Sequence, residues 1–245
     1  MPAFSKRVVL ITGAAVGIGR ACAMKFAEYG ADLALLDVDR EGLDKLVEDL
    51  RPIGARVIAS VCDISDENAV KDAVEHAFTS FGRIDILVNN AALWRDSTPF
   101  METNTDRWRR YVDVNILGTM FVTRAVLDHM INARYGRIIN VASVAGVYGN
   151  KNMVHYSMTK GAIISFTKAL AKEVAEYGIT VNATSPGTVS PSSESVDHVQ
   201  ENSMSYIGRT GSGSENAELI CYLASEEAGY VSGQNIQIDG CRRII

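Results

Sequence analysis

The 245-residue chain has few of the residues that mark a secreted, metal-binding or membrane protein. Its four cysteines form no Cys-x-x-Cys pair, and no histidines stand at metal-ligand spacing, so neither a disulfide framework nor a metal site is indicated. No run approaches the ~20 apolar residues that a membrane-spanning helix needs. We therefore expect a cytoplasmic protein with reduced thiols, no metal ion and no membrane contact.

The chain also lacks an excess of positive charge. Its 24 Lys and Arg are outnumbered by 29 Asp and Glu, which gives a formal net charge of -5. Proteins that bind nucleic acid normally carry a basic patch or stripe, so we expect no nucleic-acid partner. No linker, repeat or charge run divides the sequence, and its length suits one core, so we expect a single domain over residues 1–245.

Apolar runs rich in β-branched residues alternate along the chain with stretches of helical period. Strands are predicted at 7–12, 32–37, 56–63, 84–90, 136–143, 179–186 and 235–239. Helices are predicted at 18–30, 42–50, 66–81, 105–133, 153–178 and 216–223. Nearly unbroken Val, Ile and Leu in a strand indicate burial on both faces. The pattern predicts an α/β fold: a doubly wound, seven-stranded parallel sheet with helices on both faces.

One segment departs from this alternation. Residues 188–215 are rich in Ser, Gly and Asn and poor in apolar side chains. Long loops of this kind often serve as active-site lids, so we expect a lid here.

A glycine-rich turn, "TGAAVGIG", connects the first predicted strand to the first helix. Gly13, Gly17 and Gly19 allow a sharp turn and a close approach of the backbone to a ligand. The start of the following helix offers unpaired N–H groups and a positive dipole end to a pyrophosphate. A tight turn alone needs glycines too, but the position after the first strand of a βαβ unit favours a dinucleotide site.

Asp37 ends the second predicted strand, about twenty residues after the glycine turn. A carboxylate there can accept both hydroxyls of the adenosine ribose and would repel a 2′-phosphate, which favours NAD over NADP. Two alternatives stay open. Asp37 can instead cap the next turn. Because Arg40 lies nearby, NADP also remains an alternative cofactor.

Tyr156 and Lys160, in "YSMTK", are four residues apart and share one face of a helix. A free tyrosine has a pKa near ~10, and an ammonium close to the phenol would lower that pKa. The same spacing is common on helices without chemistry. Ser143 ends the fifth strand, where ligands bind in open parallel sheets, and its hydroxyl can donate to a substrate carbonyl. Asn115, a poor helix former, is either a satisfied polar residue or a bridge from its amide through water to Lys160.

"TGAAVGIG", "NNAA", Asn115, Ser143, "YSMTK" and "SPG" occur in the order and approximate spacing of the short-chain dehydrogenase/reductase family. The chain resembles that family over essentially its whole length. The resemblance implies a Rossmann fold with Tyr156 as catalytic acid/base, assisted by Ser143 on the substrate oxygen. It also implies that Lys160 lowers the tyrosine pKa and binds the nicotinamide ribose, and that Asn115 holds a proton-relay water.

The resemblance further implies a set of residues that bind the cofactor. They are Gly13, Gly17, Ile18 and Gly19 at the pyrophosphate, Asp63 and Ile64 at the adenine, Asn90 and Ala91 beside the adenosine ribose, Tyr156 and Lys160 at the nicotinamide ribose, and Pro186, Gly187 and Val189 at the nicotinamide. In similar enzymes the last segment orients the nicotinamide to deliver the pro-S hydride.

Two positions depart from the family pattern. Ala92 replaces the glycine of the usual "NNAG", and Pro191 stands where a threonine often binds the carboxamide. Thr188, Ser190 or Ser192 would have to replace that threonine. The sequence therefore does not determine how tightly the nicotinamide binds or how the lid is arranged.

Together these features predict an NAD-dependent oxidoreductase that interconverts a secondary alcohol and its ketone, with a small-molecule partner. The wall of the substrate pocket is expected to include Trp94, Val147, Tyr148 and Met153, with His155 either in the pocket or outside it. Related enzymes are usually homotetramers, which we expect here. An NADP-dependent 3-oxoacyl reductase and a dinucleotide-binding regulatory protein without catalysis are the alternatives.

Overall fold

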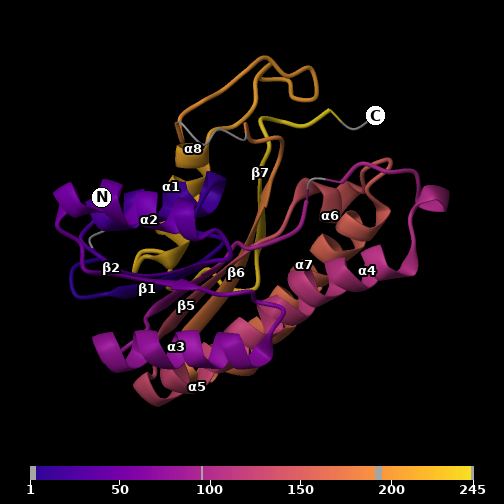
Figure 1. Cartoon of the computed structure of the whole chain (residues 1–245). Coiled ribbons are helices and arrows are strands. Elements are labelled where there is room, and N and C mark those ends of the chain that lie inside the picture. The colour runs from indigo at the N-terminus through magenta and orange to yellow at the C-terminus, as the bar shows by residue number, and fades with distance from the viewer. Residues whose placement is uncertain (1–3, 95, 191–194, 244–245) are drawn as a thin grey trace.

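The computed structural model describes residues 4–94, 96–190 and 195–243, and these form one layered α/β structure (Figure 1). Its sheet runs in the order β3-β2-β1-β4-β5-β6-β7, and each neighbouring pair is parallel. The strands are β1 (Val8–Thr12), β2 (Asp32–Asp37), β3 (Val57–Val61), β4 (Ile86–Asn89), β5 (Gly136–Val141), β6 (Ile179–Pro186) and β7 (Asn235–Ile238). The predicted doubly wound, seven-stranded parallel sheet is confirmed.

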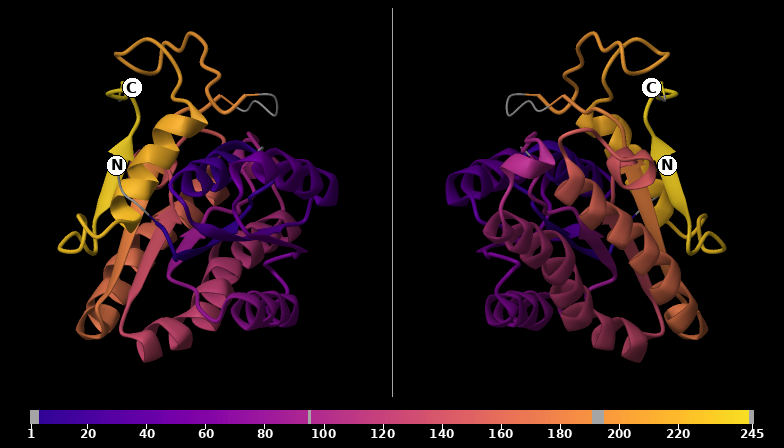
Figure 2. Two further views of the ribbon diagram at one scale, coloured as in Figure 1. Left: turned by 90° about the vertical axis from the view of Figure 1, so that its left-hand side faces the viewer. Right: turned by 90° about the vertical axis from the view of Figure 1, so that its right-hand side faces the viewer.

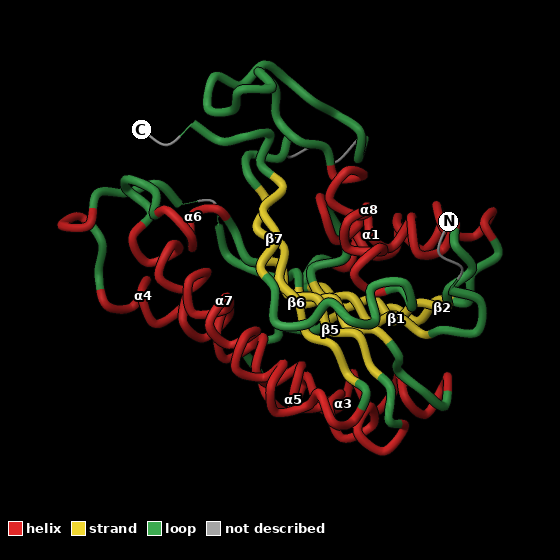
Figure 3. Tube along the Cα trace, turned by 180° about the vertical axis from the view of Figure 1, so that it is seen from behind, coloured by secondary structure: helices red, strands yellow, loops and turns green. Residues whose placement is uncertain are grey.

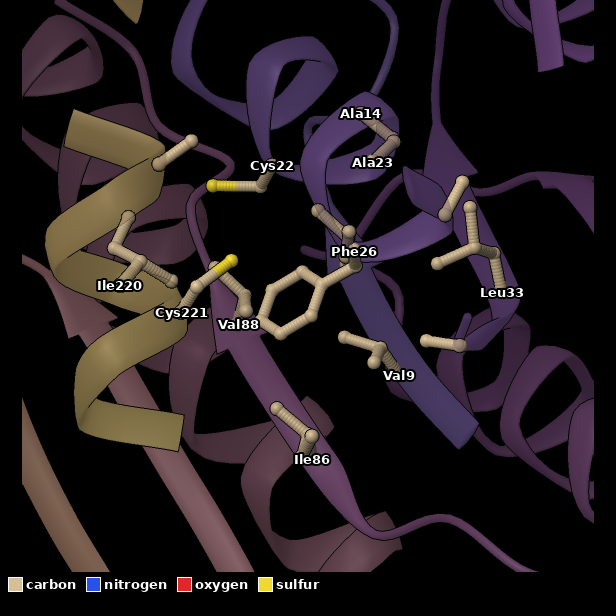
Figure 4. Close-up of a cluster of buried hydrophobic side chains, with 14 of the residues drawn as sticks. Val9, Ala14, Cys22, Ala23, Phe26, Leu33, Ile86, Val88, Ile220 and Cys221 are labelled. Carbon is tan, nitrogen blue, oxygen red and sulfur yellow. The ribbon is translucent and has the colours of Figure 1, made fainter. Parts of the chain in front are cut away.

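Helices cover both faces of the sheet, as the view from behind shows (Figure 3). One layer holds α1 (Gly17–Glu28), α2 (Arg40–Leu50) and α8 (Gly213–Ala224); the other holds α3 (Glu67–Phe81), α4 (Thr105–Val112), α5 (Thr119–Ala133) and α7 (Val154–Val174). Side chains alternate along β1, so Val9 and Ile11 enter one core while Leu10 enters the other. The first core centres on Phe26, which lies between the strands and α8 (Figure 4).

The helix predicted at 105–133 is not a regular α-helix. A π-helical segment, Asp113–Gly118, separates α4 from α5. Tight packing accompanies this irregularity, because a Cβ at Gly118 would lie 2.7 Å from Ile64 Cγ1. π-helical segments often occur at functional sites, and this one contains Asn115.

Two other helices differ from the prediction. A short helix, α6 (Val144–Tyr148), follows β5 and was not predicted; the Ser143 side chain caps it. Helix α8 begins at Gly213 rather than at 216, because Ser212 and Glu215 form a capping box. The Ser-x-x-Glu spacing is visible in the sequence and was a usable signal for that start.

The segment between β6 and α8 lies above the carboxyl end of β7 (Figure 2). Isolated bridges join Val189 to Gly211 and Glu201 to Arg209, and another joins Ser205 to Arg242 beyond β7. Within the described residues 188–190 and 195–212 there is no helix. The role of this segment as a lid stays a prediction.

Candidate active site

The carboxyl ends of the parallel strands meet at one edge of the sheet, and most predicted site residues follow these ends. The glycine turn follows β1, Asn90 follows β4, and Ser143 follows β5. Asp37 is the last residue of β2, and Pro186 is the last residue of β6. Ligands of open α/β sheets bind at this edge, so the topology brings the cofactor and catalytic candidates together.

The glycine turn is locked against the end of β4. The Asn90 Nδ2 donates to the carbonyl oxygens of Thr12 at 3.0 Å and Gly13 at 2.9 Å. A Cβ at Gly13 would lie 2.8 Å from Ala91 Cα, and a Cβ at Gly19 would lie 2.1 Å from the Gly13 oxygen. Only glycine fits at these two positions, so the close approach predicted from the sequence is present.

The start of α1 is open to a ligand. No side chain caps this helix at Val16, whereas Asp39 caps α2 and Asp66 caps α3. Gly17 has φ +57°, and a Cβ built there would meet nothing within 4 Å. Ile18, beside it, packs against the core. Uncapped N–H groups facing open space fit a pyrophosphate, which supplies the acceptors that a capping side chain would otherwise provide.

Asp37 is held by the backbone around it. Its Oδ2 accepts from the Ala15 N–H at 2.8 Å, and its Oδ1 accepts from the Asp39 N–H at 3.0 Å. The hydrogen bond from the Asp39 N–H closes the next turn, as the alternative for Asp37 predicted, and Asp39 in turn caps α2. A carboxylate has about four acceptor positions, so two remain for the hydroxyls of a ribose.

At the segment expected to contact the adenine, the side chain of Asp63 and the backbone of Ile64 are available to a ligand. The Asp63 Oδ1 accepts from the N–H and the hydroxyl of Ser65, and these hydrogen bonds lower the pKa of Asp63 below its usual value. Asp63 also lines a hollow of about 370 Å³ together with Arg110 and Val114. Ile64 is buried, so only its backbone is available to a ligand.

Ser143 and Tyr156 converge at the carboxyl end of β5. Ser143 is 8% exposed, and its Oγ accepts from the Ala145 N–H at 3.1 Å, which leaves the hydroxyl proton to be donated. Burial raises the pKa of the partly exposed Tyr156, whereas hydrogen bonding with Ser143 acts in the lowering direction. A Cβ at Gly146 would lie 2.5 Å from the Lys160 carbonyl carbon, so α6 packs closely on α7 and fixes this pair.

Lys160 differs from the prediction. Its Nζ lies 5.9 Å from the centre of the Tyr156 ring and donates to the Val141 carbonyl at 2.6 Å. The predicted lowering of the Tyr156 pKa is wrong for this arrangement, because burial dominates and raises it. Burial also lowers the pKa of Lys160 itself to about 8. The spacing of four residues correctly predicted that Tyr156 and Lys160 share one face of a helix. It could not predict that the Lys160 ammonium donates to the buried Val141 carbonyl.

The hydrogen-bond partners of the Asn115 amide were not predicted from the sequence. Its Oδ1 accepts from the Leu93 N–H at 2.7 Å, and its Nδ2 donates to the Leu93 carbonyl and to Thr159 Oγ1, each at 3.0 Å. Both amide donors and the amide oxygen are therefore used within the protein. Asn115 is therefore the satisfied polar residue that the sequence left open, and a bridge from its amide to Lys160 through water stays a prediction. Asn115 fixes the loop after β4.

The segment expected at the nicotinamide follows β6. The Gly187 N–H donates to the Ile238 carbonyl at 3.0 Å, and a Cβ there would lie 2.8 Å from Asp239 Cα. Val189 pairs with Gly211. Of the hydroxyls that were expected to replace the family's threonine, Ser190 is buried against Thr210 at 2.7 Å, whereas Thr188 is exposed. Pro191 and Ser192 lie outside the described residues.

His155 and Thr12 complete the surroundings of the site. His155 is 3% exposed, with its Nε2 3.5 Å from Asp96 Oδ2 and its ring against Tyr111, so it lies behind the site rather than on the surface. Thr12 was not predicted; its Oγ1 accepts from the N–H groups of Asn90 and Ala91. Trp94, Val147 and Tyr148, expected in the pocket wall, are exposed.

No helix within the described ranges is long and apolar enough to cross a membrane. The same part of the chain contains no group of three or more His, Cys, Asp or Glu side chains that could hold a metal ion.

Comparisons with known proteins give a consistent result. Residues 7–202 match a family model described as short chain dehydrogenase. The chain is 40% identical to the 3-oxoacyl-[acyl-carrier-protein] reductase FabG of Thermotoga maritima, covering 96% of each chain. It is 36% identical to the (2S)-[(R)-hydroxy(phenyl)methyl]succinyl-CoA dehydrogenase subunit BbsD of Thauera aromatica, covering 97% of each chain.

Two solved structures are similar over nearly the whole chain. Levodione reductase superimposes with a TM-score of 0.90 at 31% identity, covering 97% of both chains. NAD+-bound xylitol dehydrogenase superimposes with a TM-score of 0.90 at 35% identity, covering 97% of this chain and 99% of that one.

Proposed function

The chain belongs to the short-chain dehydrogenase/reductase family, and from this premise we propose that it is an NAD-dependent oxidoreductase that interconverts a secondary alcohol and its ketone. The observation that carries the proposal is the convergence of Ser143 and Tyr156 at the sheet edge that also holds the uncapped start of α1. Both hydroxyls lie where a substrate oxygen can reach a donor and an acid/base group.

The residues at the sheet edge fit a nicotinamide dinucleotide. Gly13, Gly17 and Gly19 leave room for the pyrophosphate, and Asp37 has acceptor positions for the ribose hydroxyls. Gly187 is expected at the nicotinamide. When bound, the nicotinamide would take up a hydride from the alcohol carbon or return it to the ketone carbon.

The protein's own residues handle the proton. In the oxidation direction the alcohol O–H proton moves to the Tyr156 phenolate oxygen as the C–H electron pair leaves as hydride, and a C=O double bond forms. Ser143 donates a hydrogen bond to the same substrate oxygen. Lys160, whose Nζ donates to the Val141 carbonyl and lies 5.9 Å from the centre of the Tyr156 ring, is expected to bind the nicotinamide ribose when the cofactor is present. Asn115 fixes the loop after β4 through its two hydrogen bonds with the Leu93 backbone.

Cofactor preference tests the role of Asp37. Replacing Asp37 with Asn keeps the shape and removes the charge, so kcat/KM with NAD relative to NADP is expected to fall by tenfold or more, because a charge-assisted hydrogen bond to the ribose and the repulsion of a 2′-phosphate are both lost. Steady-state kinetics with the two cofactors gives this ratio.

Asp39→Asn is the matched control. It removes the same charge two residues away, and Asn caps a helix as well as Asp does, so α2 keeps its cap. We expect its cofactor ratio to stay within about twofold of wild type. An equal change in both variants, or no change in either, would contradict the role of Asp37.

A second candidate activity is the reduction of a 3-oxoacyl thioester with NADPH. It is favoured by the 40% identity to a protein named 3-oxoacyl-[acyl-carrier-protein] reductase, and Arg40 lies close enough in sequence to Asp37 to meet a 2′-phosphate. A 3-oxoacyl thioester assayed beside secondary alcohols and simple ketones, with both cofactors, separates the two candidates.

We also propose that the protein acts as a homotetramer in the cytoplasm. Apolar side chains lie exposed on the π-helical segment, α5 and α7, at Leu117, Met120, Val154 and Met158. Burying them between subunits would remove apolar surface from water. Light scattering is expected to give four times the chain mass, and a monomeric mass would contradict the assembly. The cytoplasmic location stays a prediction from the free cysteines.

A further inference from the structure

Arg242 is an exception among the arginines of this protein. The described arginines that are at least partly buried are Arg7, Arg20, Arg107, Arg137, Arg209 and Arg242. The first five each form an ion pair with a carboxylate. Arg242 forms none with the described residues. Its one hydrogen bond from the guanidinium goes to the neutral Asn150 Oδ1, at 3.0 Å.

The position of Arg242 is fixed from two sides. Its backbone pairs with Ser205 of the segment between β6 and α8, and the neighbouring Arg243 N–H donates to the Met204 carbonyl. Its side chain reaches the loop between α6 and α7, where the Asn150 N–H donates to Ser157 Oγ. The C-terminal segment therefore lies between the predicted lid and this loop (Figure 1).

Asn150 connects Arg242 to the reacting groups. Its N–H donates to the Oγ of Ser157 at 3.1 Å, and Ser157 directly follows Tyr156 on α7. A guanidinium has five N–H donors, and only one is used by Asn150. The remaining donors, in a rigid planar fork, match the two oxygens of a carboxylate or a phosphate.

From these observations we infer that Arg242 forms a substrate subsite for an anionic group, a carboxylate or a phosphate, several bonds from the carbon that exchanges the hydride. Asn150 holds the guanidinium at the mouth of the site. The inference rests on the proposed function and narrows its substrate class to alcohols and ketones that carry a remote oxyanion.

The test uses matched substrates on the full-length protein. Three ketones of equal chain length would carry a terminal carboxylate, the isosteric primary amide, or a phosphate monoester. The measured quantity is kcat/KM for each anionic ketone divided by kcat/KM for the amide. Wild type is compared with Arg242→Gln and with Arg243→Gln, whose guanidinium lies instead 4.7 Å from the Tyr206 ring. Dinucleotide binding measured by fluorescence confirms that each variant is folded.

We expect the wild type to favour an anionic ketone, Arg242→Gln to lower that ratio by tenfold or more, and Arg243→Gln to leave it within about twofold. The anion with the larger ratio in wild type identifies the group that binds. A wild-type ratio near one for both anions, or equal losses in both variants, would overturn the subsite. Turnover of the neutral amide by wild type would still support the proposed oxidoreductase, so the two inferences fail separately.

Discussion

Tyr156→Phe is expected to lower kcat by about 10²–10⁴-fold while leaving the affinity for NADH within about twofold. The substitution removes one hydroxyl and keeps the ring that packs in the site. Ser143 can still bind the substrate oxygen, but no group remains at that position to take up or return the proton. Steady-state assays over a panel of secondary alcohols and ketones, with NADH titration by fluorescence, measure the two quantities separately.

Tyr111→Phe provides the matched control for this experiment. Tyr111 is a buried neighbour from α4, close enough for its own pKa, which burial raises to about 12, to be influenced by Tyr156. Its hydroxyl is not assigned a role in proton transfer, so activity is expected to stay within a few-fold of wild type. Near-normal turnover by Tyr156→Phe would contradict the proposed mechanism, and so would an equal loss in both variants.

The sheet and the glycine turn could be predicted because their causes are local in sequence. Runs such as "DLALLD" can be buried on both faces only in a parallel sheet covered by helices, and the structure contains that sheet. Gly13 follows a strand and Gly19 lies in the first turn of the next helix, and this placement already indicated the close approach that their surroundings require.

The contacts of the catalytic candidates could not be predicted in the same way. The carbonyl that binds Lys160 belongs to Val141, and the groups that satisfy the Asn115 amide belong to Leu93 and Thr159, all distant in sequence. Such partners are set by how helices pack on the sheet. Residue type and spacing therefore predicted which side chains meet, but not whether burial or charge would dominate their pKa values.

The contact of Arg242 is another that could not be predicted from the sequence. In the sequence it is one of two adjacent arginines near the C-terminus, and nothing distinguishes it from Arg243. The structure separates them, because one reaches Asn150 and the other lies against Tyr206. A difference in function between these neighbours therefore depends on strand pairing beyond β7, which the sequence did not indicate.

Lys160→Met is expected to reduce activity and, in the opposite direction, to stabilise the protein at neutral pH. Burial lowers the pKa of Lys160 from 10.5 to about 8, so the folded state disfavours its positive charge. That difference corresponds to a penalty of up to about 3 kcal/mol in the free energy of unfolding. Methionine has a similar length and no charge, so it removes the penalty, although losing the hydrogen bond to Val141 offsets part of the gain.

The sign of the pH dependence makes this prediction specific. Below pH 8 both folded and unfolded chains carry the Lys160 proton, so the wild type bears the full penalty and the variant its full advantage. Between pH 8 and 10.5 the folded wild type releases a proton that the unfolded chain keeps, so wild-type stability from this group rises with pH. The advantage of Lys160→Met should therefore shrink across that window and vanish above it.

Denaturant unfolding at several pH values measures the advantage, with Lys168→Met as the control because Lys168 is exposed on the same helix. The control is expected to change stability by no more than about 0.5 kcal/mol. If Lys160→Met is less stable than wild type at pH 7, or if its advantage grows between pH 8 and 10.5, then the buried ammonium does not destabilise the fold. If the predicted pattern is found, the protein keeps at its active site a charge that costs it stability, and a catalytic requirement for Lys160 explains why that charge is there.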